Sequence, residues 1–438
     1  MGSRDISCIA LGPRREFTVK ACRFAIAVVA CACAMGCATR GTTTDVTIAS
    51  PSRMTEEPAV LAVPTGNVSG TLLLPAAGYP VPVVLIVAGS GPTDRNGNTP
   101  ALPGANNSLK MLADGLASRG IASLRYDKRG IAASRNAATK EEDIRFNHFI
   151  EDAGAWVRKL RADPRFSTIT VAGHSEGSAI AMVAAKEADA DGYVSLAGAG
   201  RTAREILTEQ LSAQLPPPVF AQAVEAMKQL EQGQRPDSFP PMLTALFRPS
   251  VQPYLISWFA VNPVRNISKL DIPVLIVQGT TDLQINERDA RALAAAKPEA
   301  KLVIIEGMNH VLKHASGPIG EQMKSYSDST IVVVPRLIDE VAGFVRDLRR
   351  VRDTALGIDK LKHFLFAGYV ESVGFAGMRA LGAGRNASFA VAVGGVAVLS
   401  VAKEMRDRRT HGLFSFADLV WDALGAGAAY LILSRTPR

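Results

Sequence analysis

The chain has 438 residues, of which 47% are hydrophobic and 21% are charged, and this composition excludes a wholly disordered or collagen-like chain. Its 49 Lys and Arg residues against 41 Asp and Glu residues give a net charge of +8. Because this surplus is small and spread along the chain, we predict no nucleic-acid partner. The mean hydropathy of +0.12 indicates that some segments are more apolar than an ordinary soluble domain.

Residues 1–36 have the pattern of an export signal. Basic residues, among them Arg14 and Arg15, precede an apolar run over 24–35 that is too short to span a bilayer comfortably. The run leads into the sequence AMGC, which ends at Cys37 and resembles a bacterial lipobox. The resemblance implies a lipid on Cys37; a plain signal anchor or a buried helix is the alternative. All five cysteines lie in this part of the chain, so the remainder has no thiol nucleophile or thiolate metal ligand.

Residues 37–59 are rich in Thr and Ser, and we interpret them as a tether between the lipid and the next domain. From residue 60 to about 350, short apolar runs alternate with helical patterns. The predicted strands cover residues 82–88, 121–126, 168–172, 192–196, 272–278 and 301–305. The predicted helices cover residues 108–119, 149–160, 179–186 and 332–351. This alternation predicts an α/β fold with a doubly wound, mostly parallel sheet, whose ligands lie at the carboxyl ends of the strands. A proline-rich segment, about 201–265, is predicted to be a helical lid inserted between two of these strands.

The pentapeptide GHSEG at residues 173–177 lies between a predicted strand and a predicted helix. The pattern G-x-S-x-G in this setting forms a tight turn that exposes a serine, here Ser175. Side chains at positions 173 and 177 would clash in such a turn, which explains why both are glycine. The Ser175 hydroxyl would then lie at a helix N-terminus, where developing negative charge is stabilised. We therefore predict that Ser175 is a nucleophile.

This strand–turn–helix pattern resembles the α/β-hydrolase superfamily over residues 60–350. Members of that superfamily carry an acid after a later strand and a histidine after the last strand. Asp282 follows the strand predicted at 272–278, and His310 follows the strand predicted at 301–305. The resemblance therefore implies a catalytic triad of Ser175, Asp282 and His310, in the chain order of the superfamily. His314 is the alternative base.

The resemblance also implies an oxyanion hole formed by two backbone N–H groups. One belongs to Glu176, and the other to Ser90 in the glycine-rich loop after the first predicted strand, with Gly91 as the alternative. We expect Asp94 and Arg95 to brace this loop; contact with the substrate is the alternative. The loop and the pentapeptide are most similar to those of bacterial esterases and serine-aminopeptidase-type hydrolases. No metal or organic cofactor is expected, because a triad with two N–H donors suffices for acyl transfer.

Glu176 gives a further hypothesis, because a carboxylate beside a nucleophile would repel anionic substrates or bind a cationic end such as an amino terminus. The loop that starts at Tyr126-Asp127-Lys128-Arg129 resembles one that supports the strand ends in these hydrolases. We therefore assign Asp127 a structural role.

Residues 355–438 are predicted to form a small, hydrophobic, all-α domain that associates with the membrane. Their apolar runs cover 364–384, 387–402 and 419–434, and polar residues gather at the ends of these runs. The pattern resembles small bacterial membrane-associated domains of the VanZ-like and YfiM-like kind. In one interpretation these polar residues converge on a polar or metal site between helices: His363, Glu404, Asp407 and Asp418. In the other, which we favour from the sequence, they anchor the helices at the headgroup level.

The sequence therefore predicts an exported serine hydrolase of the bacterial cell envelope that acts on small acyl esters or aminoacyl substrates. The lipidated Cys37 and the C-terminal helices would tether it to the membrane. A serine aminopeptidase or a thioesterase with the same triad is the first alternative. A non-catalytic membrane-bound binding or scaffold protein is the second.

Overall fold

The structure is a computed structural model, and it describes residues 53–354, 358–411 and 415–435. The predicted export signal, Cys37 and most of the predicted tether lie outside these residues. The contacts divide the chain into one unit of residues 48–351 and a second unit that includes residues 352–438.

The first unit is built on an eight-stranded sheet with the strand order β1-β2-β4-β3-β5-β6-β7-β8. The strands are β1 (Thr55–Val63), β2 (Gly66–Leu74), β3 (Val81–Val87), β4 (Ala122–Tyr126), β5 (Phe166–His174), β6 (Gly192–Leu196), β7 (Val274–Gly279) and β8 (Lys301–Ile305). β1 and β2 form an antiparallel hairpin, and β2 pairs antiparallel with β4. All other neighbouring strands are parallel. The expected doubly wound, mostly parallel sheet is confirmed.

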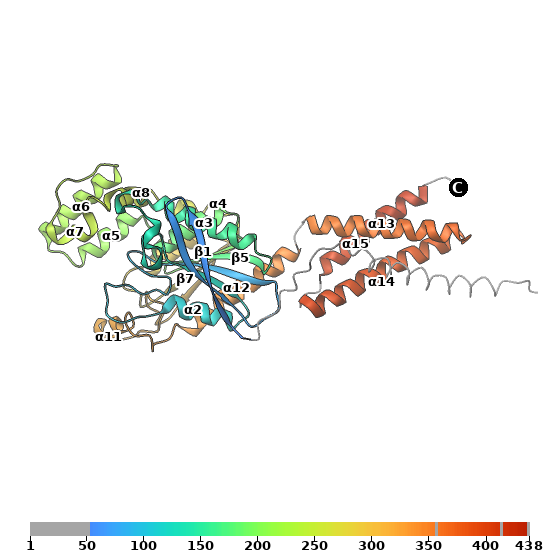
Figure 1. The fold of residues 1–438 in the computed structure, drawn as a ribbon, viewed down its shortest axis with the longest axis horizontal. Helices are drawn as coiled ribbons and strands as arrows, with labels where there is room; N and C mark the ends of the chain where they lie inside the picture. The colour runs from blue at the N-terminus through green and yellow to red at the C-terminus, as the bar shows by residue number, and fades with distance from the viewer. Residues whose placement is uncertain (1–52, 355–357, 412–414, 436–438) are drawn as a thin grey trace, which may run out of the picture. The chain divides into compact units, whose positions relative to one another are not determined.

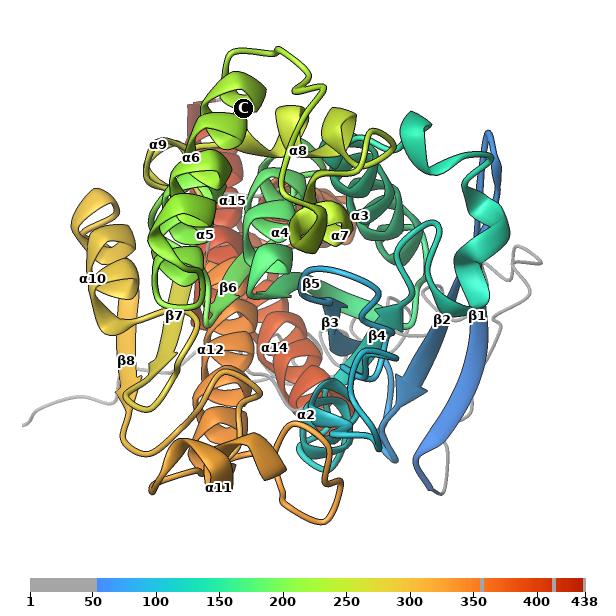
Figure 2. The same ribbon diagram turned by 90° about the vertical axis from the view of Figure 1, so that its left-hand side faces the viewer.

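The helices of this unit cover both faces of the sheet. They are α2 (Ser108–Ala117), α3 (Phe146–Arg161), α4 (Glu176–Glu187), α5 (Ala203–Ser212), α6 (Pro217–Glu231), α7 (Thr244–Phe247), α8 (Gln252–Phe259), α9 (Pro263–Ile267), α10 (Glu287–Ala296), α11 (Ile319–Lys324) and α12 (Pro335–Thr354). Short 3₁₀ turns lie at Ala132–Ala137, Glu141–Asp143 and Pro241–Leu243. Figure 2 shows α3 and α4 on one face of the sheet and α2 and α12 on the other.

Two hydrophobic cores result, one on each face, because successive strand residues point to opposite sides. In β3, Val83 and Leu85 face the core under α3 and α4, whereas Val84 and Ile86 face the core under α2 and α12. Since both faces are covered, every residue of β3 is buried, and a continuous apolar run rather than an alternating one marks the strand in the sequence.

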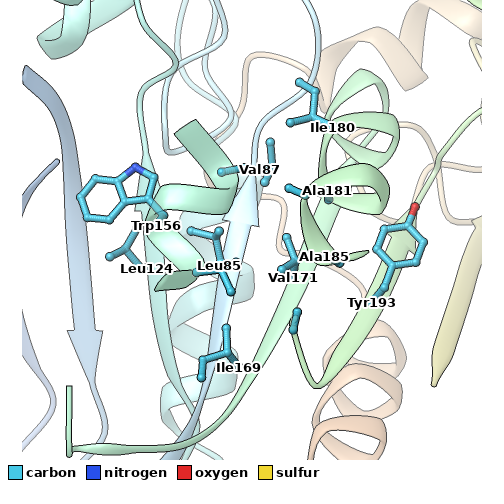
Figure 3. Close-up of a cluster of buried hydrophobic side chains, with 14 of the residues drawn as sticks. Leu85, Val87, Leu124, Trp156, Ile169, Val171, Ile180, Ala181, Ala185 and Tyr193 are labelled. Atoms are coloured by element: carbon cyan, nitrogen blue, oxygen red, sulfur yellow. The ribbon is translucent and has the colours of Figure 1, made fainter. Parts of the chain in front are cut away.

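The core under α3 and α4 fits large side chains against small ones. Leu85 is in register with Leu124 of β4 and Val171 of β5. Figure 3 shows Trp156 of α3 beside Leu124, and Ala181 of α4 near Val171. Small residues on α4 let this helix approach the sheet closely, and this approach holds the helix N-terminus at the carboxyl end of β5.

Between β6 and β7 the chain forms the helical insertion α5 to α9, with a hydrophobic cluster of its own. α5 begins with a capping box, in which the Glu205 N–H donates to Thr202 Oγ1 and the Thr202 N–H donates to the Glu205 carboxylate. α6 begins at Pro217, a residue suited to a helix start because its missing N–H has no partner there. A helical insertion is thus present where the lid is predicted, and we keep the name lid for α5 to α9.

The second unit contains α13 (Ile358–Ala380), α14 (Arg385–His411) and α15 (Phe416–Arg435). Figure 1 labels these helices, and α13 packs against both others through a cluster that includes Ala367, Val396 and Ala426. Among the described residues, two helices are long and apolar enough to cross a membrane by length and composition, at Arg385–Arg406 and Phe416–Arg435. The likeness of this unit to VanZ-like and YfiM-like domains stays a prediction.

The start of the first unit is where the structure differs from the sequence-based prediction. β1 begins at Thr55, so residues 55–59 of the predicted tether belong to the sheet, and β1 and β2 were not among the predicted strands. The reason is physical: β1 is an edge strand whose residues are mostly exposed. It therefore has little of the hydrophobic patterning that reveals a strand in a sequence.

Candidate active site

Ser175 occupies a strained turn between β5 and α4. Its φ of 55° and ψ of −122° lie outside the regions that a non-glycine residue ordinarily adopts. The Ser175 N–H donates to the Leu196 carbonyl oxygen of β6 at 2.9 Å, which fixes the turn to the sheet. Ser175 is the residue that precedes α4, so its side chain lies at a helix N-terminus.

The two glycines of the pentapeptide are required by close backbone contacts. A Cβ atom on Gly173 would overlap the backbone of Gly177, and one on Gly177 would overlap the carbonyl oxygens of Val87 and Ala88. The turn therefore brings the end of β5, the start of α4 and the end of β3 together. Only glycine fits at either position.

His310 and Asp282 form a buried pair at the carboxyl ends of β7 and β8. His310 Nδ1 lies 2.9 Å from Asp282 Oδ2 and 3.1 Å from Oδ1, and both side chains are almost fully buried. A carboxylate only accepts hydrogen bonds, so Nδ1 carries the proton and Nε2 has a free lone pair. His314, the alternative base, is exposed and packs over Gly307. The structure therefore pairs Asp282 with His310 rather than with His314.

Asp282 is held by more than the histidine. The backbone N–H groups of Gln284 and Ile285 donate to Oδ1 at 2.8 and 3.0 Å, and Gln278 Nε2 donates to Oδ2 at 3.1 Å. Burial by itself would raise the pKa of Asp282, but His310 and the two backbone donors outweigh it and lower the pKa. The carboxylate therefore stays ionised beside the imidazole.

His174, directly before Ser175, ties the turn to the histidine loop. Its Nε2 donates to the His310 carbonyl oxygen at 2.7 Å, and the two imidazole centroids are 4.9 Å apart. Burial and then the neighbouring His310 lower the pKa of His174 to about 4. His174 thus stays neutral at physiological pH and acts as a packed structural histidine.

A small cavity of about 80 Å³ brings Ser175 together with the two predicted oxyanion residues, Ser90 and Glu176. Glu176 is the first residue of α4, where backbone N–H groups have no acceptor within the helix. The remaining lining comes mostly from the lid and from small or apolar side chains: Ala179, Ala199, Arg201, Ala203, Ile206, Leu207, Gln210, Trp258, Val261, Pro263, Gln284 and Ile285.

The Glu176 side chain is engaged within the protein. Its Oε1 accepts a hydrogen bond from Lys128 Nζ at 2.7 Å, and its Oε2 accepts one from the Tyr254 hydroxyl of α8 at 2.6 Å. Lys128 Nζ also donates to the Gly89 carbonyl oxygen at 2.7 Å. The hypothesis that Glu176 binds a cationic substrate end or repels an anionic one is therefore corrected, because a buried ammonium neutralises this carboxylate.

The loop after β3 is braced as expected. Asp94 Oδ1 accepts hydrogen bonds from the N–H groups of Asn96 and Asn98. Arg95 forms an ion pair of 2.7 Å with Asp127, whose Oδ1 also accepts the Arg95 N–H. The bracing role of Asp94 and Arg95 and the structural role of Asp127 are both confirmed.

A second cavity, of about 520 Å³, adjoins the acid of the pair. It is lined by Asp282, Gln284, Gln210, Tyr326 and Met323 among others. Gln210 and Gln284 line both cavities, and Gln210 Nε2 donates to the Gln284 carbonyl oxygen at 3.2 Å. This contact between α5 and the loop after β7 lies where the two cavities approach each other.

The strand order, the strained serine turn at the end of β5 and the acid–histidine pair after β7 and β8 decide the fold. The molecule has the α/β-hydrolase fold. A family model described as serine aminopeptidase, S33, matches residues 105–237. Esterase EstD from Thermotoga maritima is 28% identical over 288 residues, which cover 64% of this chain and 66% of that protein. Both matches agree with the α/β-hydrolase superfamily, and this chain spans about two thirds of the length of that esterase.

Similar solved structures include two of low sequence identity. Est1E from Butyrivibrio proteoclasticus is 16% identical with a TM-score of 0.43, covering 66% of this chain and 98% of that one. The α/β hydrolase GrgF from Penicillium sp. sh18 is 18% identical with a TM-score of 0.45, covering 68% of this chain and 99% of that one.

Sequence reasoning did not find three residues that shape the site: Lys128, Tyr254 and Gln278. Lys128 lies in the loop that the sequence analysis singled out for Asp127, but nothing in the sequence identifies its partner Glu176. Tyr254 comes from the lid and Gln278 from within β7. A buried polar residue inside an apolar strand, such as Gln278, is the one signal that could have pointed to a role in the α/β-hydrolase site.

Proposed function

We propose that this protein is a serine hydrolase that cleaves small carboxylic esters through an acyl-enzyme on Ser175. The observation that carries the proposal is the buried pair of His310 and Asp282. The His310 carbonyl oxygen also accepts a hydrogen bond from His174, the residue before the strained Ser175. The similar protein EstD is named an esterase, and this name agrees with the proposal.

In the proposed reaction Ser175 Oγ attacks the carbonyl carbon of the ester, and His310 Nε2 takes the hydroxyl proton. Asp282 keeps the proton of His310 on Nδ1 and stabilises the imidazolium that forms. His310 then gives its proton to the departing alcohol, which leaves an acyl group on Ser175. A water molecule, activated by the same histidine, releases the acid and restores the serine.

The negative charge of the tetrahedral intermediate is assigned to the N–H groups of Ser90 and Glu176. Both residues line the cavity that holds Ser175. The Glu176 N–H lies at the start of α4, so the helix dipole adds to its hydrogen bond. Lys128 supports the Ser90 side of this oxyanion hole, because its ammonium donates a hydrogen bond to the carbonyl oxygen of Gly89, one residue before Ser90.

The cavity volumes favour a short acyl group. The space beside Ser175 measures about 80 Å³ and has mostly apolar or small lining residues, so we assign it to the acyl chain. The space of about 520 Å³ beyond Gln210 is wider, and we assign it to the leaving alcohol. A compact acyl group on a larger alcohol is therefore the preferred substrate in this proposal.

The aminopeptidase alternative would need an anionic group to bind a substrate amino terminus. Among the described residues that line the small cavity, Glu176 is the acidic one, and Lys128 and Tyr254 occupy its carboxylate. In the larger cavity, Glu209 pairs with Arg201 and Arg288, and Asp282 pairs with His310. These pairings favour neutral esters over aminoacyl substrates.

The test measures hydrolysis by the full chain in detergent of nitrophenyl esters from acetyl to dodecanoyl, beside an acyl thioester and an alanyl nitroanilide. Ser175→Ala is the test variant, and Ser118→Ala, at the exposed end of α2, is the matched control. We expect fastest turnover of the short esters, loss of at least a thousandfold in Ser175→Ala and no loss in Ser118→Ala. Turnover confined to the nitroanilide or the thioester would move the assignment to those alternatives. Folded protein with neither turnover nor labelling by a fluorophosphonate would favour the non-catalytic binding protein.

We further propose that the protein is exported and tethered to the membrane of the bacterial cell envelope. The C-terminal helices support this, because many of their large apolar side chains are exposed, for example Phe366, Tyr369, Phe416, Leu431 and Ile432. An exposed apolar helix surface is unfavourable in water and favourable in contact with lipid. The lipid on Cys37 rests on the sequence pattern alone.

The tether is tested by metabolic labelling with an alkynyl fatty acid in a bacterial host. The wild-type chain should incorporate the label and fractionate with membranes, whereas Cys37→Ser should lose the label and stay in membranes through α14 and α15. Equal labelling of both chains would contradict lipidation of Cys37. Release of Cys37→Ser into the soluble fraction would contradict membrane association through α14 and α15.

A further inference from the structure

The C-terminal unit holds a cluster of buried polar side chains at one end of its helices. His363 lies near the start of α13, Glu404 near the end of α14 and Asp418 near the start of α15, and all three are buried. The sequence analysis favoured a headgroup anchor for these residues. Their burial between helices contradicts that interpretation, because an anchor at the headgroup level must be exposed.

The three side chains present their donor atoms to one another at spacings suited to a metal ion. One ligand atom from each lies within 4.8 Å of the other two. His363 Nε2 is 3.5 Å from Asp418 Oδ2. Two ligands that each lie about 2.1 Å from a tetrahedral metal ion are about 3.4 Å apart, so this pair already has the spacing of a coordination edge.

The orientation of the imidazole supports the same conclusion. His363 Nδ1 lies 2.9 Å from Asp422 Oδ1, one turn further along α15. The Asp422 carboxylate accepts the Nδ1 proton, so Nε2, which faces Asp418, is the nitrogen left to bind a metal ion. A histidine whose second nitrogen is held by a carboxylate is the usual arrangement of a metal ligand in proteins.

Charge gives an independent reason for a cation here. Among the buried side chains at this end, Glu404, Asp418 and Asp422 supply three carboxylates, and Lys360 supplies one ammonium group. Lys360 is buried against Asp418 Oδ1. Lys403 Nζ lies 3.0 Å from Glu404 Oε1 and 3.9 Å from Asp418 Oδ2, and its side chain is 46% exposed. An exposed ammonium thus lies between two carboxylates that a metal ion would share.

We propose that His363 Nε2, Glu404 and Asp418 bind one divalent first-row metal ion, with Zn²⁺ as the best match to a ligand set of one imidazole and two carboxylates. The exposed Lys403 moves away when the ion binds, whereas Asp422 holds the histidine and Lys360 holds the far oxygen of Asp418. Three protein ligands leave a fourth position for water or for a bound anionic or carbonyl group. This site is separate from the proposed esterase reaction and does not depend on it.

The test measures binding of Zn²⁺ alone to the full chain in detergent, after chelation, by competition with a chromophoric chelator and by metal analysis after dialysis. Glu404→Gln and Asp418→Asn should each lose one equivalent of zinc relative to the wild type. Comparing chains that differ at one position removes the contribution of the N-terminal cysteines and of other histidines. Circular dichroism of the metal-free proteins checks that the helices remain.

Lys403→Met keeps the proposal falsifiable if the carboxylate variants unfold. Removing a competing ammonium should tighten zinc binding at least tenfold and should increase the rise in thermal unfolding temperature on adding zinc. If the cluster is only an ion-pair network, Lys403→Met will lower the unfolding temperature and gain no zinc. That result, or equal zinc content in the wild type and the carboxylate variants, would overturn the proposal.

Discussion

The Lys128 ammonium lies 2.7 Å from the Glu176 carboxylate, and both side chains are almost fully buried. The same ammonium holds the Gly89 carbonyl oxygen, and Tyr254 of the lid donates to the other oxygen of Glu176. Burial and then the charge of Glu176 raise the pKa of Tyr254 well above its ordinary value, so the phenol keeps its proton and remains a donor. One buried network therefore connects the loop after β3, the residue after Ser175 and the lid.

Lys128→Met should destabilise the hydrolase unit by about 3–5 kcal/mol, because it leaves the Glu176 carboxylate buried without a counter-charge. The double variant Lys128→Met/Glu176→Gln should recover most of this stability. The ester turnover of the double variant should nevertheless stay below that of the wild type, because the Gly89 carbonyl oxygen no longer accepts a hydrogen bond from Lys128. Chemical unfolding followed by tryptophan fluorescence and initial rates with nitrophenyl acetate check both parts. A double variant as unstable as Lys128→Met would contradict the pairing.

Glu176→Gln should leave the preference between neutral and cationic substrates within about threefold of the wild type, because the carboxylate is already neutralised inside the protein. The measurement is the ratio of kcat/KM for a neutral ester to that for an ester with an aminoacyl group. A change in this ratio of tenfold or more would mean that Glu176 contacts the substrate, and would revive the aminopeptidase alternative.

Stability should fall on the acid side because of His174. Its pKa falls from 6.5 to about 4 on burial, so the unfolded chain binds a proton that the folded chain does not. The contribution of His174 is complete above the unfolded value and is lost as the pH falls toward the folded one. Between pH 7.5 and pH 4.5 it should amount to roughly 2–3 kcal/mol.

His174→Gln keeps a donor for the His310 carbonyl and removes this titration. Between pH 7.5 and pH 4.5, the free energy of unfolding should therefore change by roughly 2–3 kcal/mol less in the variant than in the wild type. A Trp421→Phe background reports on the hydrolase unit alone, because the other two of the three tryptophans, Trp156 and Trp258, lie in residues 48–351. Parallel pH profiles for both proteins would contradict a neutral, buried His174.

Ile206→Ala should widen the small cavity and shift the acyl preference toward longer chains. Ile206 of α5 lines the space beside Ser175, and one methylene in such a pocket changes specificity by about tenfold or more. We expect the ratio of kcat/KM for butyryl to acetyl ester to rise at least tenfold. Leu211→Ala is the control, because Leu211 packs within the lid. An unchanged ratio in Ile206→Ala would move the acyl group to the larger cavity.

The sequence by itself determined the local features of this protein. Buried parallel strands are continuous apolar runs, and a serine turn of the pattern G-x-S-x-G is recognised from five consecutive residues between a predicted strand and a predicted helix. The positions of β6 and β8, the lid between β6 and β7, and the choice of His310 therefore followed from short stretches of sequence and from the superfamily's chain order. The hairpin of β1 and β2 did not, because its first strand is an exposed edge with weak hydrophobic patterning.

The tertiary structure alone decided which charges meet. Glu176 is paired with Lys128, 48 residues before it, and with Tyr254, 78 residues after it, and no local pattern predicts such partners. In the C-terminal unit the same helix-end residues could face solvent as anchors or one another as ligands, since their sequence spacing is compatible with both. Packing of α13 against α14 and α15 buries them together, because a helix face is polar or apolar only relative to the neighbour that covers it.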